Sequence, residues 1–429
     1  MTSIFIPSFR AGGTAAAPAS KSDLHRLLIL AFLRGKPTKV CNLNLCDDVQ
    51  ATIDCLRALG ANIEIQSNTA IVSPLGFPSG EAVEHSETDE GPADKPQKQN
   101  ATSSAAFGGT FPKGEGKGVT LDARESGSTL RFLLPIACAL YPRVRFTARG
   151  SLLTRPIGGI VECLKAHGVS FSSDTLPFET SGLLRAGEYQ IDASLSSQYA
   201  SGLLMASVIT GGRVNITGKA ASAPYIDLTK RRINEFRSGK AVFTAEGDWS
   251  AAAALLCLPG EVTVTGLDPV SPQADKAILS ALEKSGAEIT WNGGSVTVRN
   301  THPKPFSFDV GDCPDIAPCL AVLMAAGAVS EATSSLTGCK RLIYKESNRA
   351  EAIVNLINNL GGSASFDGDT ILIRGPLTGG KVKTFSDHRI AMAGCVAAAW
   401  SESGAEIDDI DCVGKSCPDF RKLIDSLRK

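Results

Sequence analysis

Residues 20–31 read Ser-Lys-Ser-Asp-Leu-His-Arg-Leu-Leu-Ile-Leu-Ala, and the fold can be worked out from this stretch. Starting from Leu24, apolar residues lie at i, i+3, i+4 and i+7, a spacing that predicts a helix with one buried face. Either serine can cap its first turn, where backbone N–H groups lack partners. Lys21 and Arg26 add two cations at the same end. Because a helix start attracts anions, this arrangement predicts a phosphate or carboxylate site, with solvated cations beside an ordinary cap as the alternative interpretation.

The same design, a polar start followed by an apolar helix of small residues, returns five more times along the chain. The other starts lie at Ser126, Ser196, Asp248, Pro314 and Ser386. In most units a second helix follows, ends at a glycine and leads into two short strands, as in residues 47–72. This succession predicts six βαβαββ-like repeat units.

Two units depart from the pattern. In the third, a helix over residues 225–236 is followed by so few residues that we expect its hairpin to be compressed into Lys240–Thr244. In the sixth, the helix over residues 419–427 has no strand after it, and we expect Ile4–Ile6 to supply the missing strand. Both ends of the sequence would then lie in one domain.

Length and composition limit the class of protein. A chain of 429 residues exceeds one ordinary core, so we expect two domains. A net charge of −1 argues against a general nucleic-acid binder. No apolar run is long enough to span a bilayer and no secretory leader is evident, so we expect a cytoplasmic protein with no membrane partner. The 12 cysteines form no CxxC pair and only five histidines accompany them, which predicts reduced, buried thiols and no bound metal.

Residues 78–118 interrupt the repeat. They are rich in Gly, Pro, Ser, Glu and Lys and have almost no bulky apolar residue, which predicts a flexible surface insertion. The segment Gly114–Gly118 lacks the glycine order and the final Ser or Thr of a P-loop, so we exclude a nucleotide site there.

Cations gather at the expected helix starts in both halves of the chain. Thr154-Arg155-Pro156 places an arginine before a proline that we expect to open a helix. Lys345 and Arg349 are spaced i, i+4, so on a helix they would share one face, and Glu346 would lie next to that face. A row of ion pairs on the protein surface has the same spacing and is the alternative interpretation. The full set of these cations is Lys21, Arg26, Arg131, Arg155, Lys345, Arg349, Arg389 and Lys415. The set predicts a cleft between two domains that binds substrates with several negative charges.

Two carboxylates accompany these cations. Asp315 lies beside Pro314 at a helix start, where it is either an N-cap or a base that accepts a proton from a substrate hydroxyl. Glu346 is the natural second acid–base group. A protein that only binds anions gains nothing from carboxylates there, so the pair favours an enzyme over a non-catalytic repeat protein that binds an anionic metabolite.

An ordered set of motifs runs through nearly the whole chain. It consists of Lys21-Ser22-x-x-x-Arg26, Ser126-Gly127-Ser128-x-x-Arg131, Arg155-Pro156-Ile157, Ser196-Ser197-Gln198, Pro224-Tyr225-Ile226-Asp227, Gly247-Asp248, Pro314-Asp315, Lys345-Glu346-Ser347-x-Arg349, Asp387-His388-Arg389 and Lys415-Ser416. In these motifs and their order the chain resembles the 3-phosphoshikimate 1-carboxyvinyltransferase family of enolpyruvyl transferases, also called 5-enolpyruvylshikimate-3-phosphate synthases. The resemblance implies an α/β (α+β) fold, a two-domain inside-out α/β barrel with three βαβαββ units in each domain. It places one domain at residues 21–245 and the other at residues 1–20 plus 246–429.

The same resemblance implies an activity and a site. The family transfers the enolpyruvyl group of phosphoenolpyruvate to the 5-hydroxyl of shikimate 3-phosphate and releases phosphate, in the shikimate pathway to chorismate and the aromatic amino acids. Asp315 would take the hydroxyl proton and Glu346, with Lys345 nearby, would protonate the methylene carbon; Lys21 completes the catalytic set. The shikimate 3-phosphate site would comprise Lys21, Ser22, Arg26, Ser196, Ser197, Gln198, Ser222, Tyr225, Asp315, Arg341 and Lys345. The phosphoenolpyruvate site, which glyphosate occupies in the family, would comprise Lys21, Gly127, Arg131, Arg155, Gln198, Arg349, His388, Arg389 and Lys415. No metal or organic cofactor is implied, and we expect a monomer.

Two features separate the chain from its nearest relatives. The family often has an asparagine where this chain has Arg341. Enolpyruvyl transfer to UDP-N-acetylglucosamine uses the same fold, but that relative usually has a Lys-Asn pair in place of Lys21-Ser22 and a cysteine on a mobile loop. Residues 78–118 contain no cysteine, which favours shikimate 3-phosphate as the acceptor.

Overall fold

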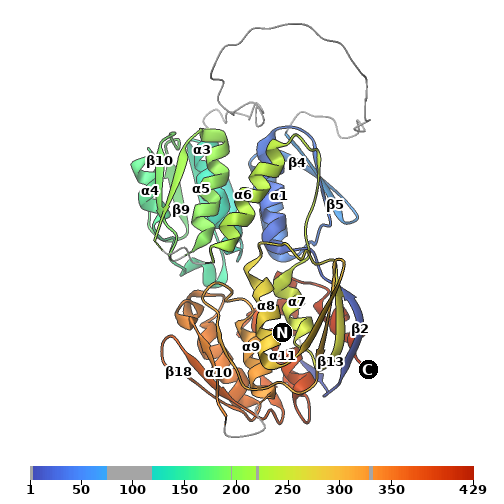
Figure 1. Cartoon of the computed structure of the whole chain (residues 1–429). Helices are drawn as coiled ribbons and strands as arrows, with labels where there is room; N and C mark the ends of the chain where they lie inside the picture. The colour runs from blue at the N-terminus through green and yellow to red at the C-terminus, as the bar shows by residue number, and fades with distance from the viewer. Residues whose placement is uncertain (1–2, 75–117, 195, 219–221, 328–331) are drawn as a thin grey trace, which may run out of the picture.

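The structure, a computed structural model, describes residues 3–74, 118–194, 196–218, 222–327 and 332–429. They form two lobes, one above the other in Figure 1, each with its own hydrophobic core. The core of the first lobe takes buried residues from Ala19 to Ala245. The core of the second lobe takes buried residues between Ile6 and Ala15 and then from Trp249 to Leu427. Residues 78–117 of the expected insertion lie outside the described residues.

The first lobe contains three sheets and six α-helices among the residues described. Its helices are α1 (Lys21–Arg34), α2 (Asp47–Ala58), α3 (Gly127–Leu140), α4 (Ile160–Ala166), α5 (Ser197–Thr210) and α6 (Pro224–Arg237). Its strands are β3 (Thr38–Cys41), β4 (Ala61–Gln66), β5 (Thr69–Pro74), β6 (Val119–Asp122), β7 (Arg143–Thr147), β8 (Ser170–Phe171), β9 (Phe178–Ser181), β10 (Glu188–Asp192), β11 (Arg213–Thr217) and β12 (Val242–Thr244). They pair in the orders β12-β3-β5-β4, β6-β7-β9-β8 and β10-β11.

The described part of the second lobe repeats this plan. Its helices are α7 (Trp249–Leu256), α8 (Ile278–Ser285), α9 (Ala317–Ala326), α10 (Arg349–Asn359), α11 (His388–Trp400) and α12 (Phe420–Leu427). Its strands are β1 (Ile4–Ile6), β2 (Ala11–Ala16), β13 (Gly260–Thr265), β14 (Glu288–Asn292), β15 (Ser295–Asn300), β16 (Ser307–Asp309), β17 (Ser334–Thr337), β18 (Ser363–Phe366), β19 (Ile371–Arg374), β20 (Gly380–Val382) and β21 (Ala405–Ile407). They pair in the orders β14-β15-β13-β2, β16-β17-β19-β18 and β1-β21-β20.

The four-stranded sheets share one pairing scheme, which confirms the predicted repeat. In each, an outer strand pairs in parallel with the next, and an antiparallel hairpin completes the sheet, as in β6-β7-β9-β8. The missing strand of the sixth unit is supplied as predicted, because β1 pairs antiparallel with β21. Strand β2 was not predicted. Its sequence, AGGTAA, has little β-propensity, and it lies in the sheet beside β13, where Figure 1 shows the blue strand among yellow and red elements.

The compressed hairpin of the third unit was a wrong prediction. The segment supplies a single three-residue strand, β12, which pairs in parallel with β3 of the first unit. Three residues suffice for one edge strand but not for two antiparallel strands and a turn, so the third sheet keeps only β10 and β11.

Helix α1 begins at Lys21 with Ser20 as its cap, whose side chain accepts a bond from the Asp23 N–H, and ends at Gly35 in the left-handed conformation. From Asp23 to Arg34 every residue is buried, so the helix is enclosed on all sides rather than on the one predicted face. Helices α9 and α11 are enclosed in the same way. These three helices therefore lie inside their lobes with the sheets around them, as expected for the inside-out arrangement that the resemblance implied.

Two predictions about helices were wrong. Pro156 does not open a helix, because Gly158 takes a left-handed conformation with φ 72° and α4 begins only at Ile160. Lys345 and Arg349 do not share a helical face. A 3₁₀ helix ends at Tyr344, the backbone at Lys345 is extended, and α10 begins at Arg349.

Three further findings concern the described ranges of the chain. No helix there is long and apolar enough to cross a bilayer. No group of His, Cys, Asp and Glu in the same ranges is arranged to hold a metal ion. All twelve cysteines are described and free, and ten of them are buried, as predicted.

Candidate active site

A cavity of about 340 Å³ lies between the lobes and is lined by residues of both. Fourteen predicted site residues line it: Lys21, Ser22, Gly127, Arg131, Arg155, Ser196, Ser197, Gln198, Ser222, Tyr225, Asp315, Arg341, Lys345 and Glu346. Five others are not part of the lining but interact with residues that are: Arg26, Arg349, His388, Arg389 and Lys415. The fold thus brings together groups that are more than 300 residues apart in the chain.

Helix starts form most of the wall contributed by the first lobe. Ser126 and Ser196 cap α3 and α5, so both helices direct their first N–H groups toward the cavity side. Gln198 is held in place by two partners: its Oε1 accepts from Arg131 Nη1 at 2.8 Å, and its Nε2 donates to Ser128 Oγ at 2.8 Å. Such mutual bonds fix the side chains before a ligand arrives.

Arg26 lies behind this wall and is almost fully buried. Its guanidinium donates to Thr229 Oγ1 at 2.7 Å and to the Tyr225 carbonyl at 3.0 Å. Burial lowers its pKa to about 10, despite the Asp23 carboxylate nearby. Its guanidinium also donates to the Ser22 carbonyl, so Arg26 supports Ser22 and Tyr225 and is not itself part of the cavity lining.

Asp315 is the centre of the wall contributed by the second lobe. Lys345 Nζ lies 3.1 Å and Arg349 Nη1 2.8 Å from its Oδ1, and Arg389 Nη2 lies 3.7 Å from its Oδ2. Burial by itself raises the pKa of this carboxyl, but the three cations hold the pKa well below its usual range. Asp315 is therefore ionised, as a base must be.

Glu346 lies beside Asp315 and is bound from both lobes. Arg349 Nη2 donates to its Oε2 at 2.6 Å, and Arg155 of the first lobe approaches its Oε1 at 3.6 Å. Although burial opposes ionisation, Arg155 and Arg349 hold the pKa of Glu346 well below the ordinary value. His388 is neutral, because burial and the charges of Lys21 and Arg389 lower its pKa well below the ordinary value.

Arg349 is itself oriented by a carboxylate that sequence reasoning assigned no role. Asp387, the cap of α11, accepts from Arg349 Nε at 3.0 Å and from Nη2 at 3.2 Å, and both side chains are fully buried. The motif that contains Asp387 was noted, but its distant partner is visible only in the fold.

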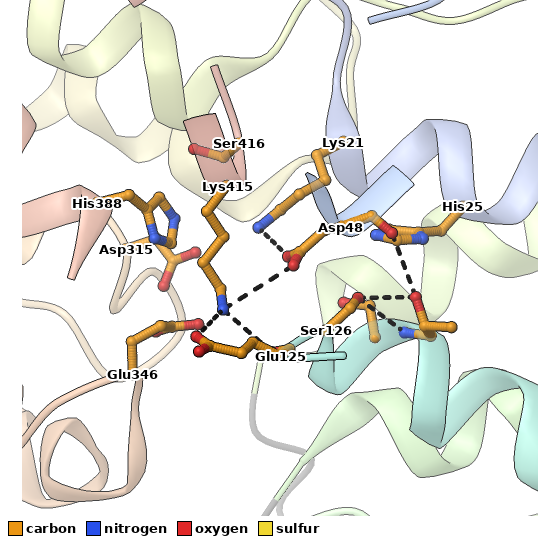
Figure 2. Close-up of polar contacts among 12 residues, drawn as sticks. Lys21, His25, Asp48, Glu125, Ser126, Asp315, Glu346, His388, Lys415 and Ser416 are labelled. Atoms are coloured by element: carbon orange, nitrogen blue, oxygen red, sulfur yellow. Dashed lines mark hydrogen bonds and ion pairs between the residues drawn. The ribbon is translucent and has the colours of Figure 1, made fainter. Parts of the chain in front are cut away.

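The two lysines of the predicted phosphoenolpyruvate site are paired with carboxylates of the first lobe. Lys21 Nζ donates to Asp48 Oδ2 at 2.9 Å, and Lys415 Nζ donates to Glu125 Oε2 at 3.2 Å and to the Glu125 carbonyl at 3.1 Å. Figure 2 shows Lys415 reaching from the side of His388, Asp315 and Glu346 toward Asp48 and Glu125. Neither Asp48 nor Glu125 was predicted. Asp48 falls in the first turn of a helix, where an acidic residue needs no further explanation.

Asp275 is a third unpredicted carboxylate, and it lines the cavity. Its Oδ2 accepts from the Ser250 hydroxyl and from the Tyr225 hydroxyl, the latter at 3.3 Å. Burial, followed by the charge of Asp315, raises its pKa to about 6. Arg341 lines the cavity as well, and its guanidinium donates to the Gly311 carbonyl.

The model of the family "EPSP synthase (3-phosphoshikimate 1-carboxyvinyltransferase)" matches residues 8–85, 93–242 and 235–424. The chain belongs to this family. A 3-phosphoshikimate 1-carboxyvinyltransferase of Methanocorpusculum labreanum is 31% identical over 97% of this chain and 96% of its own length. One of Brachyspira hyodysenteriae is 34% identical over 72% of this chain and 80% of its own length. Among solved structures, an EPSP synthase of Acinetobacter baumannii superposes with a TM-score of 0.74 at 20% identity and covers 99% of this chain and 98% of that one.

These similarities confirm three of the predictions made from the sequence: the family, the mixed α/β fold and the assignment as an enzyme. The cavity between the lobes is where the predicted residues of this family come together.

Proposed function

We propose that this chain transfers the enolpyruvyl group of phosphoenolpyruvate to the 5-hydroxyl of shikimate 3-phosphate and releases phosphate. The observation that carries the proposal is the position of Asp315 and Glu346 in one cavity, surrounded by cations of both lobes. Both substrates carry a carboxylate and a phosphate, so a site for the pair needs many cations together with groups that move protons.

The acceptor, shikimate 3-phosphate, would lie against α1, α5 and α6. We assign to it Lys21, Ser22, Arg26, Ser196, Ser197, Gln198, Ser222, Tyr225, Arg341 and Lys345, with Asp315 at the reacting hydroxyl. Hydroxyls and N–H groups at the start of α5 suit a phosphate, and Arg26 would act from behind Ser22. Arg341, where the family often has asparagine, adds a cation to this side of the cavity.

The donor, phosphoenolpyruvate, would lie between the lobes. We assign to it Lys21, Gly127, Arg131, Arg155, Gln198, Arg349, His388, Arg389 and Lys415. Arg155 and Lys415 come from different lobes, and each is now paired with a carboxylate across the cleft. A bound anion would replace these carboxylates as the partner of the cations.

The chemistry then follows in two stages. The 5-hydroxyl oxygen attacks C2 of phosphoenolpyruvate while Asp315 takes its proton and protonated Glu346 delivers a proton to C3, which gives a tetrahedral intermediate. In the second stage C3 returns the proton to Glu346, the bond from C2 to the phosphate oxygen breaks, and phosphate leaves with the hydroxyl proton. Glu346 is ionised without substrate, so binding must raise its pKa, and an anion that engages Arg155 and Arg349 does so.

We further propose that the two lobes act as domains, residues 21–245 and residues 1–20 with 246–429, that close over the substrates. The chain crosses between them at two adjacent places, where Ser20 N–H donates to the Glu246 carbonyl at 2.8 Å and Asp248 N–H donates to the Pro18 carbonyl at 2.8 Å. Crossings side by side form a natural hinge. One chain supplies every group assigned above, which supports a monomer, and its twelve free thiols support a cytoplasmic location.

Phosphate release by the purified protein tests the function. We expect turnover with phosphoenolpyruvate and shikimate 3-phosphate and none when UDP-N-acetylglucosamine replaces the acceptor. Turnover with the UDP-sugar alone would transfer the assignment to the related enzyme. Binding of both substrates without any release of phosphate would make the chain a non-catalytic binder.

A further inference from the structure

Asp48 lies at the centre of the donor side of the cavity, yet the reaction above gives it no role. It is the second residue of α2, and its side chain is only 7% exposed. Its Oδ2 accepts from Lys21 Nζ at 2.9 Å, and its Oδ1 lies 4.0 Å from Lys415 Nζ. In Figure 2 a dashed line joins the Asp48 carboxylate to each of the two ammonium groups.

The contacts of Asp48 reach three elements that carry assigned donor groups. Lys21 opens α1 at the crossing between the lobes, and Lys415 ends a 3₁₀ helix of the second lobe. The carbonyl of Asp48 also accepts from Thr129 Oγ1 at 3.3 Å, two residues beyond Gly127 in the first turn of α3. One buried residue therefore connects the separate parts that must meet around a single small anion.

Charge explains why a carboxylate is needed there. Two buried ammonium groups directed at the same place repel each other, and a carboxylate between them offsets this repulsion. Burial by itself lowers the pKa of Lys21, but Asp48 acts strongly in the opposite direction and the net pKa lies above the ordinary value. The other charged or titratable groups that face Lys21 are Cys46, His25, Glu346, His388 and Arg389.

We propose that Asp48 is a positioning residue that holds the Lys21 and Lys415 ammonium groups, one from each lobe, at the spacing in which they bind the same phosphoenolpyruvate anion. The inference rests on the proposed function, because it concerns the donor subsite of that reaction. Asp48 acts through the lysines and does not touch the anion, since two negative groups in contact would repel. If Asp48 instead only occupied the lysines until the substrate displaced it, removing its charge would raise the affinity for phosphoenolpyruvate.

The test compares Asp48→Asn, Asp48→Glu and Asp47→Asn with the wild type in steady-state kinetics. Asp47 is the exposed neighbour in the same helical turn, so Asp47→Asn makes the same change of charge at a solvated carboxylate. For Asp48→Asn we expect the KM for phosphoenolpyruvate to rise about tenfold, as for the weakening of one charge-assisted hydrogen bond, with the KM for shikimate 3-phosphate nearly unchanged. Asp47→Asn should match the wild type.

The pH profile adds a readout that a purely structural residue would not move. Without the Asp48 charge, Lys21 should lose its proton at lower pH, so the alkaline limb of kcat/KM for phosphoenolpyruvate should shift down by about one pH unit in Asp48→Asn. Asp48→Glu keeps the negative charge but moves it. The alkaline limb of kcat/KM should therefore lie at the same pH as in the wild type, while the KM for phosphoenolpyruvate rises about threefold.

The outcomes separate the two proposals. If the wild type turns over but Asp48→Asn leaves the KM for phosphoenolpyruvate unchanged or lowers it, the positioning role is refuted and the function stands. Equal changes in both KM values refute it as well. If Asp48→Asn does not fold, the selective rise in Asp48→Glu decides in its place. If the wild type itself does not release phosphate, the function fails first.

Discussion

Arg155 of the first lobe and Glu346 of the second lobe form an ion pair across the cleft, with 3.6 Å between Arg155 Nη2 and Glu346 Oε1. Both side chains are largely buried, so little solvent screens them. The pair links the separation of the lobes to the protonation of the group that we assign as the acid. In the structure Glu346 is ionised and its carboxylate bridges the lobes. By the proposed mechanism, an anion bound to Arg155 would let Glu346 take up a proton.

Replacing the acid should therefore abolish most of the activity and leave the fold intact. For Glu346→Gln we expect kcat to fall by about 10²–10⁴, the usual contribution of general acid–base catalysis, and Asp315→Asn should have a similar effect. Glu351→Gln, an exposed change five residues further on, is the control and should leave kcat unchanged. A Glu346→Gln enzyme with a normal kcat would disprove the assigned role.

Gly127 should be a sensitive point of the donor subsite. A Cβ at this position would lie 2.7 Å from Arg131 Nη1 and 3.5 Å from Arg155 Nη1, so a methyl group has to displace one guanidinium and enters the space in front of another. We expect Gly127→Ala to weaken inhibition by glyphosate by about tenfold or more, since a displacement of 1 Å at such a site can be that costly. Gly159→Ala, where a Cβ meets no atom within 4 Å, is the matched control. Equal inhibition constants in both variants would place glyphosate elsewhere.

The buried pair Arg232–Asp23 should be important for stability. Arg232 Nε donates to Asp23 Oδ1 at 2.7 Å, and the other Asp23 oxygen accepts from the Glu246 N–H at 3.1 Å where the chain crosses between the lobes. Asp23 is fully buried, so Arg232→Met removes its ion-pair partner and should lower the free energy of unfolding by about 3–5 kcal/mol in urea titrations. Lys230→Met, on the exposed face of the same helix, should change it by less than about 1 kcal/mol. Comparable losses in the two variants would contradict the special role of the pair.

His25 should make stability depend on pH. It is buried, its Nδ1 lies 2.7 Å from Thr52 Oγ1, and burial lowers its pKa to about 3 from an ordinary 6.5. Between these two values the unfolded chain binds a proton that the folded chain does not, so stability is lost as the pH falls below 6.5. From pH 7 to pH 5 this amounts to about 2 kcal/mol, which His25→Gln should remove from the pH dependence. Urea titrations at pH 7 and pH 5 measure this difference in the free energy of unfolding. The same difference in the variant as in the wild type would exclude His25 as its source.

Sequence patterns predicted what is local. Helices begin at Lys21, Gly127 and Ser197 because a capping side chain and an apolar run lie together in the chain, and the structure has each helix there. The same reasoning failed where a residue distant in the sequence determines the local backbone conformation or strand pairing. Residues 242–244 pair with β3 rather than with a neighbouring strand, and the backbone at Lys345 leaves the helical conformation where that residue's side chain meets Asp315.

The candidate site divides in the same way. The cations could be found from the sequence because arginines and lysines at helix starts are unusual and the family motifs contain them. Asp48, Glu125 and Asp275 could not, because acidic residues are common in helices and loops and only the folded chain shows which groups they meet. Asp387 was found as part of a motif, but its bonds to Arg349 span 38 positions.

The pairing of β1 with β21 also fixes an order of events during synthesis on the ribosome. Ile4 leaves the exit tunnel early, but its partner Ile407 is made some 400 residues later. Every residue of the first lobe's core is translated before Trp249, so that lobe can fold while the earliest strands are still without their sheet. We therefore expect the first lobe of nascent chains stalled shortly after residue 300 to resist proteases while β1 remains open to cleavage.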